Sequence, residues 1–351
     1  MNRPAILVLS AAFVLVACNR GGSSDTGPTA QGSTKPTGLK VVYIPKSTGI
    51  SYFDEIDKGF KQAQAELGYD YAEVAPAKAD PTSQIPDIKD QIQQGVDVLA
   101  ISANDKDALV PVLDQAKAKG ITVITVDADI TGNESHRDVA VLQTDAKTIG
   151  QSQIELLGSL IGYKGDFAIL SAQSNAPNQN AWIAAMNDTL KDPKYAGMHL
   201  VATVYGDDEA QKSTSECEGL LSRYPNLRGI ISPTSVGLAA AAQVVETRGV
   251  YPGGPHAVGG GLQLTGLSTP NQLKSFVTKG EVTKFQLWLP SNMGYLAGYL
   301  GSLIHSGKLK PAPGATFTTP KVKPDPIGPN NVVYGGPLIT FDKSNIDQYS
   351  F

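Results

Sequence analysis

Short β-branched runs alternate with amphipathic helical segments along most of the chain, and this alternation limits the possible folds more than any other feature. The first half carries such runs at Val41–Ile44, Val98–Ile101 and Thr122–Val126. Apolar residues spaced three and four apart follow them, as between Phe53 and Ala63. Strands separated by amphipathic helices predict βαβ units and therefore a parallel sheet flanked by helices. The expected fold class is α/β.

The same pattern begins again with Val139–Leu142, and four further strands are predicted at Phe167–Leu170, Leu200–Val204, Gly229–Ile231 and Ala257–Val258. A single open sheet of more than about ten strands would be unusual, so we expect two similar lobes joined by hinge strands. Short runs between Val332 and Phe341 follow a Pro-rich stretch and are predicted to cross between the lobes. The expected N-terminal lobe is 39–141 with about 290–325, and the C-terminal lobe is 142–289 with about 326–351.

The first 17 residues have the composition of a secretory signal peptide. Arg3 precedes an apolar stretch, Pro4–Ala17, which is shorter than the roughly 20 residues that span a bilayer. The run Leu15-Val16-Ala17-Cys18 is similar to the lipobox of bacterial lipoproteins, which implies lipidation of Cys18. Residues 18–38 are rich in Gly, Ser, Thr and Pro and predict a flexible tether. We therefore expect a lipid-anchored protein on the cell membrane, facing the periplasm or the cell exterior.

Composition and motifs exclude several classes of protein. The 29 basic and 33 acidic residues give a formal charge of −4, which argues against nucleic-acid binding. Four widely spaced histidines form no local zinc motif, and nucleophile-elbow, phosphate-loop and dinucleotide fingerprints are absent from the sequence. Gly259-Gly260-Gly261 is interpreted as a tight turn, and Cys217 as a buried core thiol. The prediction is a protein that is not an enzyme and uses no cofactor or metal.

Polar and aromatic residues gather at the carboxyl ends of the predicted strands, where open parallel sheets bind ligands. These positions hold Lys46, Tyr52-Phe53, Ser102–Asp105, Asp127–Asp129, Ser171–Gln179, Tyr205–Asp208, Ser232–Ser235 and Trp288. Carboxylates and amides bind hydroxyl groups, while aromatic faces cover the apolar side of a sugar ring. The mixture predicts a polyhydroxylated, uncharged ligand. Of the two carboxylates that follow Val126, Asp127 is expected to face the ligand and Asp129 the surface.

Several motifs resemble those of class I periplasmic sugar-binding proteins, and within them the branch of rhamnose-binding and autoinducer-2-binding proteins. They are Val42-Tyr43-Ile44-Pro45-Lys46 with Tyr52-Phe53, Val126-Asp127-Ala128-Asp129, Asn178-Gln179-Asn180-Ala181-Trp182, Ser232-Pro233-Thr234-Ser235, Phe285-Gln286-Leu287-Trp288, and the ending Asn345–Phe351. The resemblance spans the chain from about Leu39 to the last residue. It implies two lobes that close over a sugar at a hinge, and docking of the closed form on an ABC permease with its ATPase subunit.

The resemblance also implies which residues contact the ligand. The family pattern places Lys46, Asp127, Gln179 and Pro233 against the sugar, with Asn178 and Ser235 at the remaining polar positions and Tyr52, Phe53 and Trp288 as aromatic walls. Ser102 at a strand end completes the predicted set, while Trp182 is interpreted as core.

The resemblance leaves two ligands open. Autoinducer-2 receptors usually carry Asp and Ala where this chain has Asn178 and Ser235, and ribose-type relatives carry Arg at the position of Ala128. The expected function is therefore capture of a monosaccharide, with rhamnose favoured and autoinducer-2 as the alternative. Capture proteins of this type usually act as monomers, which we expect here.

Overall fold

The computed structural model describes residues 38–351, which belong to one compact unit. The predicted signal peptide (1–17), the lipidation site Cys18, and the predicted tether (18–38) apart from Gly38 lie outside the described residues. No helix between residues 38 and 351 has the length and apolarity that crossing a membrane requires.

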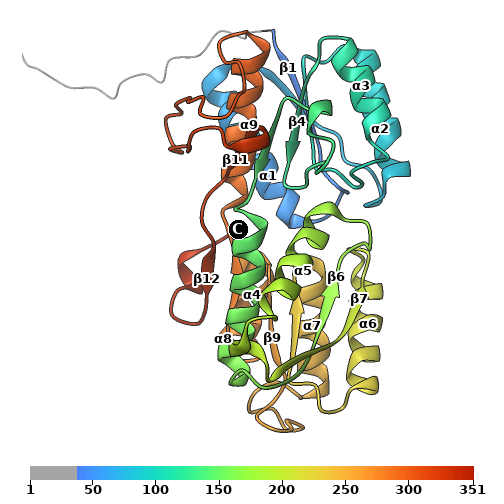
Figure 1. The fold of residues 1–351 in the computed structure, drawn as a ribbon, viewed down its shortest axis with the longest axis vertical. Helices are drawn as coiled ribbons and strands as arrows, with labels where there is room; N and C mark the ends of the chain where they lie inside the picture. Colours follow the sequence, from blue (N-terminus) through green and yellow to red (C-terminus); the bar gives the residue numbers. More distant parts are fainter. Residues whose placement is uncertain (1–37) are drawn as a thin grey trace, which may run out of the picture. The chain divides into compact units, whose positions relative to one another are not determined.

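The first lobe is built on a parallel sheet of six strands, counted within the described range, in the order β11-β5-β4-β3-β1-β2 (Figure 1). Its strands are β1 (Lys40–Ile44), β2 (Asp70–Glu73), β3 (Val98–Ile101), β4 (Thr122–Val126), β5 (Val139–Leu142) and β11 (Val332–Tyr334). Its helices are α1 (Ser51–Leu67), α2 (Pro81–Gln94), α3 (Val110–Ala118) and α9 (Pro290–His305).

Helices cover both faces of this sheet because its central strands are apolar on both faces. Val42 and Ile44 of β1 share one core with α2 and α3, whereas Val41 and Tyr43 share the other with α1 and α9. The two helices α1 and α9 pack very closely. A Cβ on Gly294 of α9 would lie 1.9 Å from a backbone oxygen of α1, so only glycine fits there. This packing fixes α1, whose first turn carries two predicted ligand contacts.

The second lobe holds a parallel sheet in the order β7-β6-β8-β9 and an antiparallel pair, β10-β12. A bridge between Leu267 and Gln286 connects the sheet to this pair. The strands are β6 (Gly165–Ser171), β7 (Met198–Tyr205), β8 (Gly229–Ser232), β9 (Gln263–Gly266), β10 (Phe285–Leu287) and β12 (Ile339–Phe341). The helices are α4 (Ala146–Ile161), α5 (Pro177–Thr189), α6 (Ala210–Arg223), α7 (Ser235–Arg248) and α8 (Pro270–Lys279).

The chain passes between the lobes three times: from β5 to α4, from β10 to α9, and from β11 to β12 (Figure 1). The last passage comes later than the expected position near residue 326. Residues 332–334 pair in parallel with β5 of the first lobe and bury Val333, so the chain changes lobes after Tyr334. The predicted α/β class, with parallel sheets flanked by helices, is confirmed.

The strand predicted at Ala257–Val258 is wrong. Val258 is 68% exposed, and the strand of this region is β9, five residues farther along. The following Gly259, Gly260 and Gly261 all have positive φ, as the predicted tight turn requires and a strand forbids. Cys217 is buried, in agreement with the prediction.

Candidate ligand-binding site

A cavity lies where the carboxyl ends of strands from the two sheets meet. It encloses about 420 Å³, counted with its opening to solvent. The first lobe contributes Lys46, Ile50, Tyr52, Phe53 and Asp127. The second lobe contributes Asn178, Gln179, Trp182, Asp208, Pro233, Thr234, Ser235, Leu267, Leu287 and Trp288.

Nine of the ten residues predicted to contact ligand line this cavity, and Ser102 is the exception. The Ser102 side chain is fully buried. Its hydroxyl donates to the Val126 carbonyl at 2.7 Å and lies 3.0 Å from the Tyr43 hydroxyl. Ser102 therefore ties the end of β3 to its neighbours β4 and β1 and does not face the cavity.

Lys46 connects the two lobes across the cavity. It follows β1, and its side chain is buried. The Lys46 Nζ donates to Oδ1 of Asn178 in the first turn of α5, at 2.8 Å. The same Oδ1 accepts the backbone N–H of Gln179 at 3.0 Å, which fixes the amide orientation. The remaining ammonium hydrogens can donate to ligand oxygens.

Asp127 supplies an anionic acceptor beside Lys46. It follows β4 with a φ of 69°, a left-handed conformation that Asp tolerates better than most residues. Its Oδ1 accepts from the Tyr52 hydroxyl at 2.7 Å and from Gln143 Nε2 at 2.5 Å. Its Oδ2 has one long contact, 3.5 Å from Asn178 Nδ2. Burial raises the pKa of Asp127, although the Lys46 charge and the hydrogen bonds oppose the shift.

Gln179 is held from two sides. Its Nε2 donates to the Pro233 carbonyl at 2.6 Å, and its Oε1 accepts from the Ser171 hydroxyl at 3.3 Å. These bonds join the start of α5 to the loop between β8 and α7, which also carries Thr234 and Ser235. The polar side of the cavity is thus fixed before any ligand arrives.

Aromatic rings form another part of the cavity wall. Trp288 is 2% exposed, and its indole N–H donates to the Tyr52 hydroxyl at 3.0 Å. The Trp182 and Trp288 rings lie 5.8 Å apart, and Phe53 packs edge-on against Tyr52 at 5.3 Å. Ile50, Leu267 and Leu287 extend this surface. The cavity lining therefore combines hydrogen-bonding groups with apolar surface.

Six lining residues were not among the predicted contacts: Ile50, Trp182, Asp208, Thr234, Leu267 and Leu287. Trp182 is buried, as expected of core, but it also faces the cavity. Asp208 and Thr234 belong to strand-end segments that the sequence already marked as polar. Ile50, Leu267 and Leu287 carry no such signal, because an apolar wall residue resembles any other core residue.

Asp129 is not at the surface, in contrast to the prediction. The Arg137 guanidinium donates to both of its carboxylate oxygens at 2.7 Å, and both side chains are buried. The Thr125 hydroxyl also donates to Asp129, at 2.6 Å. The expected divergence of Asp127 and Asp129 holds, but Asp129 turns toward a buried partner. This pair braces the loop that presents Asp127.

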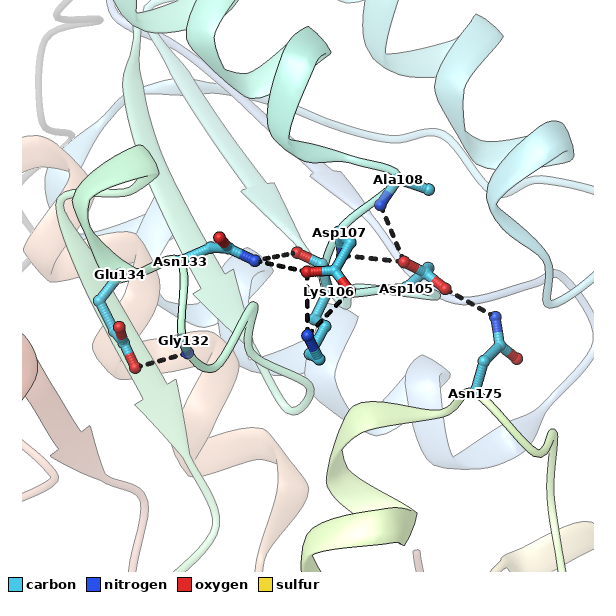
Figure 2. A network of polar contacts seen from close by, with 8 residues as sticks. All are labelled: Asp105, Lys106, Asp107, Ala108, Gly132, Asn133, Glu134 and Asn175. Carbon is cyan, nitrogen blue, oxygen red and sulfur yellow. Dashed lines mark hydrogen bonds and ion pairs between the residues drawn. The ribbon is translucent and has the colours of Figure 1, made fainter.

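A polar network at the rim makes a further contact between the lobes, outside the cavity. Figure 2 shows Asn175, from the loop before α5, pointing toward Asp105 in the loop before α3. Asn175 Nδ2 donates to Asp105 Oδ2 at 3.0 Å, while Oδ1 of Asp105 accepts the backbone N–H groups of Asp107 and Ala108 at 2.8 Å. Burial alone would raise the pKa of Asp105, but the Ala108 and Asn175 hydrogen bonds outweigh it and the pKa is lowered.

Fold and cavity together define a two-lobed α/β protein that encloses a small polar ligand between its lobes. A model of the periplasmic binding protein domain matches residues 41–309, and the chain belongs to this family. The family is one of binding proteins, so the chain is not an enzyme. In the described residues, no group of three or more His, Cys, Asp or Glu side chains is arranged to hold a metal ion.

Relatives and solved structures refine this assignment. A solute-binding protein from Clostridium phytofermentas with bound L-rhamnose is 32% identical, covers 90% of this chain and 98% of its own, and superposes with a TM-score of 0.83. LsrB from Clostridium saccharobutylicum in complex with AI-2 is 25% identical, with 89% and 100% covered and a TM-score of 0.80. The D-ribose/D-allose-binding protein of Pseudomonas aeruginosa is 27% identical over 71% of this chain and 78% of its own. The chain is accordingly a periplasmic binding protein, and it is similar to proteins that bind sugars or AI-2.

Proposed function

We propose that this protein captures a 6-deoxyhexose, with L-rhamnose as the preferred ligand. The observation that carries the proposal is the combination of charged and amide side chains with aromatic rings in the lining of one cavity. Lys46, Asp127, Asn178 and Gln179 would bind the ring hydroxyls, since carboxylates and amides form hydrogen bonds with them. Trp288, Tyr52 and Phe53 would cover the apolar face of the ring. The similarity to a structure with bound L-rhamnose supports the same assignment.

The apolar wall also explains the preference for a deoxy sugar. A methyl group has no hydrogen bonds to lose on burial, whereas a buried hydroxyl without a partner would be destabilising. Ile50, Leu267 and Leu287 offer a surface suited to the methyl carbon. Pro233 and Ser235 would complete the contacts on the second lobe.

AI-2 is the second candidate, favoured by the similarity to LsrB and by the presence of Lys46, Asp127 and Gln179 at the expected positions. The amide of Asn178 argues for the sugar. An amide is a weaker acceptor than the carboxylate usual in AI-2 receptors, because hydrogen bonds to charged groups are the strong ones.

Titration of the purified full chain by tryptophan fluorescence will test both ligands. The two tryptophans of the chain, Trp182 and Trp288, both line the cavity, so the signal reports on the site itself. We expect a saturable change with L-rhamnose and a weaker one with ribose, glucose or the AI-2 precursor. A response to the AI-2 precursor alone would make the protein a signal receptor. The absence of any response, checked by calorimetry, would contradict the proposal.

The proposal includes anchoring at a lipidated Cys18, action as a monomer, and closure of the lobes before docking on the permease. The three passages of the chain between the lobes would act as hinges. A ligand shifts the balance of open and closed forms only by its different affinity for each. Contacts that exist only in the closed form therefore contribute to apparent affinity without touching the sugar.

Replacing Asn175 with alanine tests this coupling. The change removes the Asp105–Asn175 hydrogen bond at the rim and leaves the cavity intact. A hydrogen bond of this kind contributes about 0.5–1.5 kcal/mol, so we expect L-rhamnose to bind roughly 2- to 10-fold more weakly in calorimetry. The matched control is Asn180→Ala, because Asn180 is exposed and its amide donates only within its own lobe, to Ser174. Equal affinities of the two variants would refute a role of this contact in closure.

A further inference from the structure

We infer that Asp208 is a specificity-determining residue that accepts a hydrogen bond from one ligand hydroxyl, at the end of the cavity nearest the outer groove. This inference rests on the proposed function and deepens it. Asp208 follows β7 and lines the cavity, and it also lines a separate groove between the lobes that opens outward. Ile50 is the other residue shared by the two spaces, so the pair forms the boundary between them.

The backbone of Asp208 is held in an unfavourable left-handed conformation, and this conformation sets the direction of its side chain. Asp207 and Asp208 have φ values of 55° and 54°, and two consecutive non-glycine residues in this region are uncommon. Hydrogen bonds fix the turn at the pair and just before it. The Gly206 N–H donates to the Ser171 carbonyl at 2.8 Å, and Gln173 Nε2 donates to the Asp207 carbonyl at 2.7 Å. Strain maintained in this way at a cavity wall indicates that the direction of the side chain matters.

The two neighbouring carboxylates point to different partners. Asp207 forms an ion pair with Lys212 of α6, away from the cavity. Asp208 accepts the Thr234 hydroxyl through Oδ1. Its Oδ2 has no hydrogen-bond partner among residues 38–351, although the side chain is partly buried in the cavity wall. A ligand hydroxyl would satisfy this oxygen, and a hydrogen bond to a carboxylate is stronger than one between neutral groups.

Charge in the cavity adds a second element of selection. Lys46, Asp127 and Asp208 are the charged residues that line it within the described chain, and their formal sum is −1. Burial raises the pKa of Asp208, and attraction to Lys46 together with the Thr234 hydrogen bond opposes that rise. A negatively charged sugar acid would face two carboxylates and one ammonium group. The chemistry therefore favours a neutral sugar with a hydroxyl directed at Asp208.

Measuring the affinities of Asp208 variants for L-rhamnose and for its deoxy analogues tests the inference. Asp208→Asn is the main variant because Asn tolerates positive φ and the turn should survive. Asp208→Gly, which relieves the backbone strain, is the second. The probes are L-rhamnose and its 2-, 3- and 4-deoxy analogues, with binding to the full chain measured by calorimetry. The matched control is Asp207→Asn, which leaves the cavity unchanged.

We expect Asp208→Asn to bind L-rhamnose about 10- to 100-fold more weakly than the wild type. One deoxy analogue should bind wild type and Asp208→Asn with similar affinity, because that analogue lacks the hydroxyl group that donates a hydrogen bond to Asp208. Asp207→Asn should bind as the wild type does. Unchanged rhamnose affinity in both Asp208 variants would overturn the inference while the proposed function stands. Failure of the wild type to bind L-rhamnose would instead overturn the proposed function, and this inference with it.

Discussion

Replacing Asp127 with alanine will weaken L-rhamnose binding by on the order of 100-fold. The Oδ1 atom of Asp127 is already occupied by Tyr52 and Gln143, whereas its Oδ2 has only a 3.5 Å contact with Asn178 and is the acceptor available to a ligand. A hydrogen bond to a charged group contributes about 1.5–3 kcal/mol, and the substitution also removes one of the two carboxylates near the buried Lys46. Calorimetric titration of the purified variant measures the effect.

Two further variants make this result decisive. Alanine at a φ of 69° adds backbone strain, so Asp127→Asn is the companion variant that keeps the left-handed preference and removes only the charge. It should also bind weakly. Asp70→Ala is the control, since Asp70 is exposed at the opposite, amino end of its strand. Wild-type affinity in Asp127→Asn would show that the carboxylate charge is not needed for binding.

The fold could be predicted from the sequence wherever strands are buried on both faces. Val98–Ile101 and Thr122–Val126 were located to the residue, because every position in them is buried and a polar residue, Ser102 or Asp127, follows each. The strand β9 was missed because three of its four residues are polar or glycine. Its Thr265 is fully buried, but the sequence alone does not distinguish a buried threonine from an exposed one.

The candidate site was predictable to a large extent, because the carboxyl ends of parallel strands place their loops at one edge. That rule marked the strand-end segments, and the family resemblance selected within them the nine predicted residues that line one cavity. It could not give the direction of each side chain. Ser102 follows a strand like the others, but its hydroxyl donates a hydrogen bond to the Val126 carbonyl in the neighbouring strand, so the side chain points into the core and not into the cavity. Asp129 forms an ion pair with Arg137, eight residues farther along the chain, and the periodicity of the sequence does not reveal such a pair.

The pairing of Asp129 with Arg137 leads to the largest stability effect that we expect. Both side chains are almost completely buried, and the guanidinium binds the carboxylate through two nitrogen atoms while its third reaches the Asn330 carbonyl at 2.8 Å. Arg137→Met leaves the Asp129 carboxylate buried without a counter-charge. Removing one partner of such a pair typically costs about 3–5 kcal/mol. Urea unfolding, followed by the tryptophan signal, should show this loss in the free energy of unfolding.

The double variant Asp129→Leu, Arg137→Met separates the cost of an unpaired charge from the loss of the pair itself. Because replacing a whole buried pair by apolar residues is often neutral, we expect it to recover much of the stability that Arg137→Met loses. The control is Lys191→Met, which breaks the exposed ion pair with Asp188 and should change stability far less. Equal urea midpoints for wild type and Arg137→Met would show that the pair does not stabilise the fold. A double variant that is as unstable as the single one would mean that the hydrogen bonds to Thr125 and Asn330, rather than the charges, hold the loop that presents Asp127.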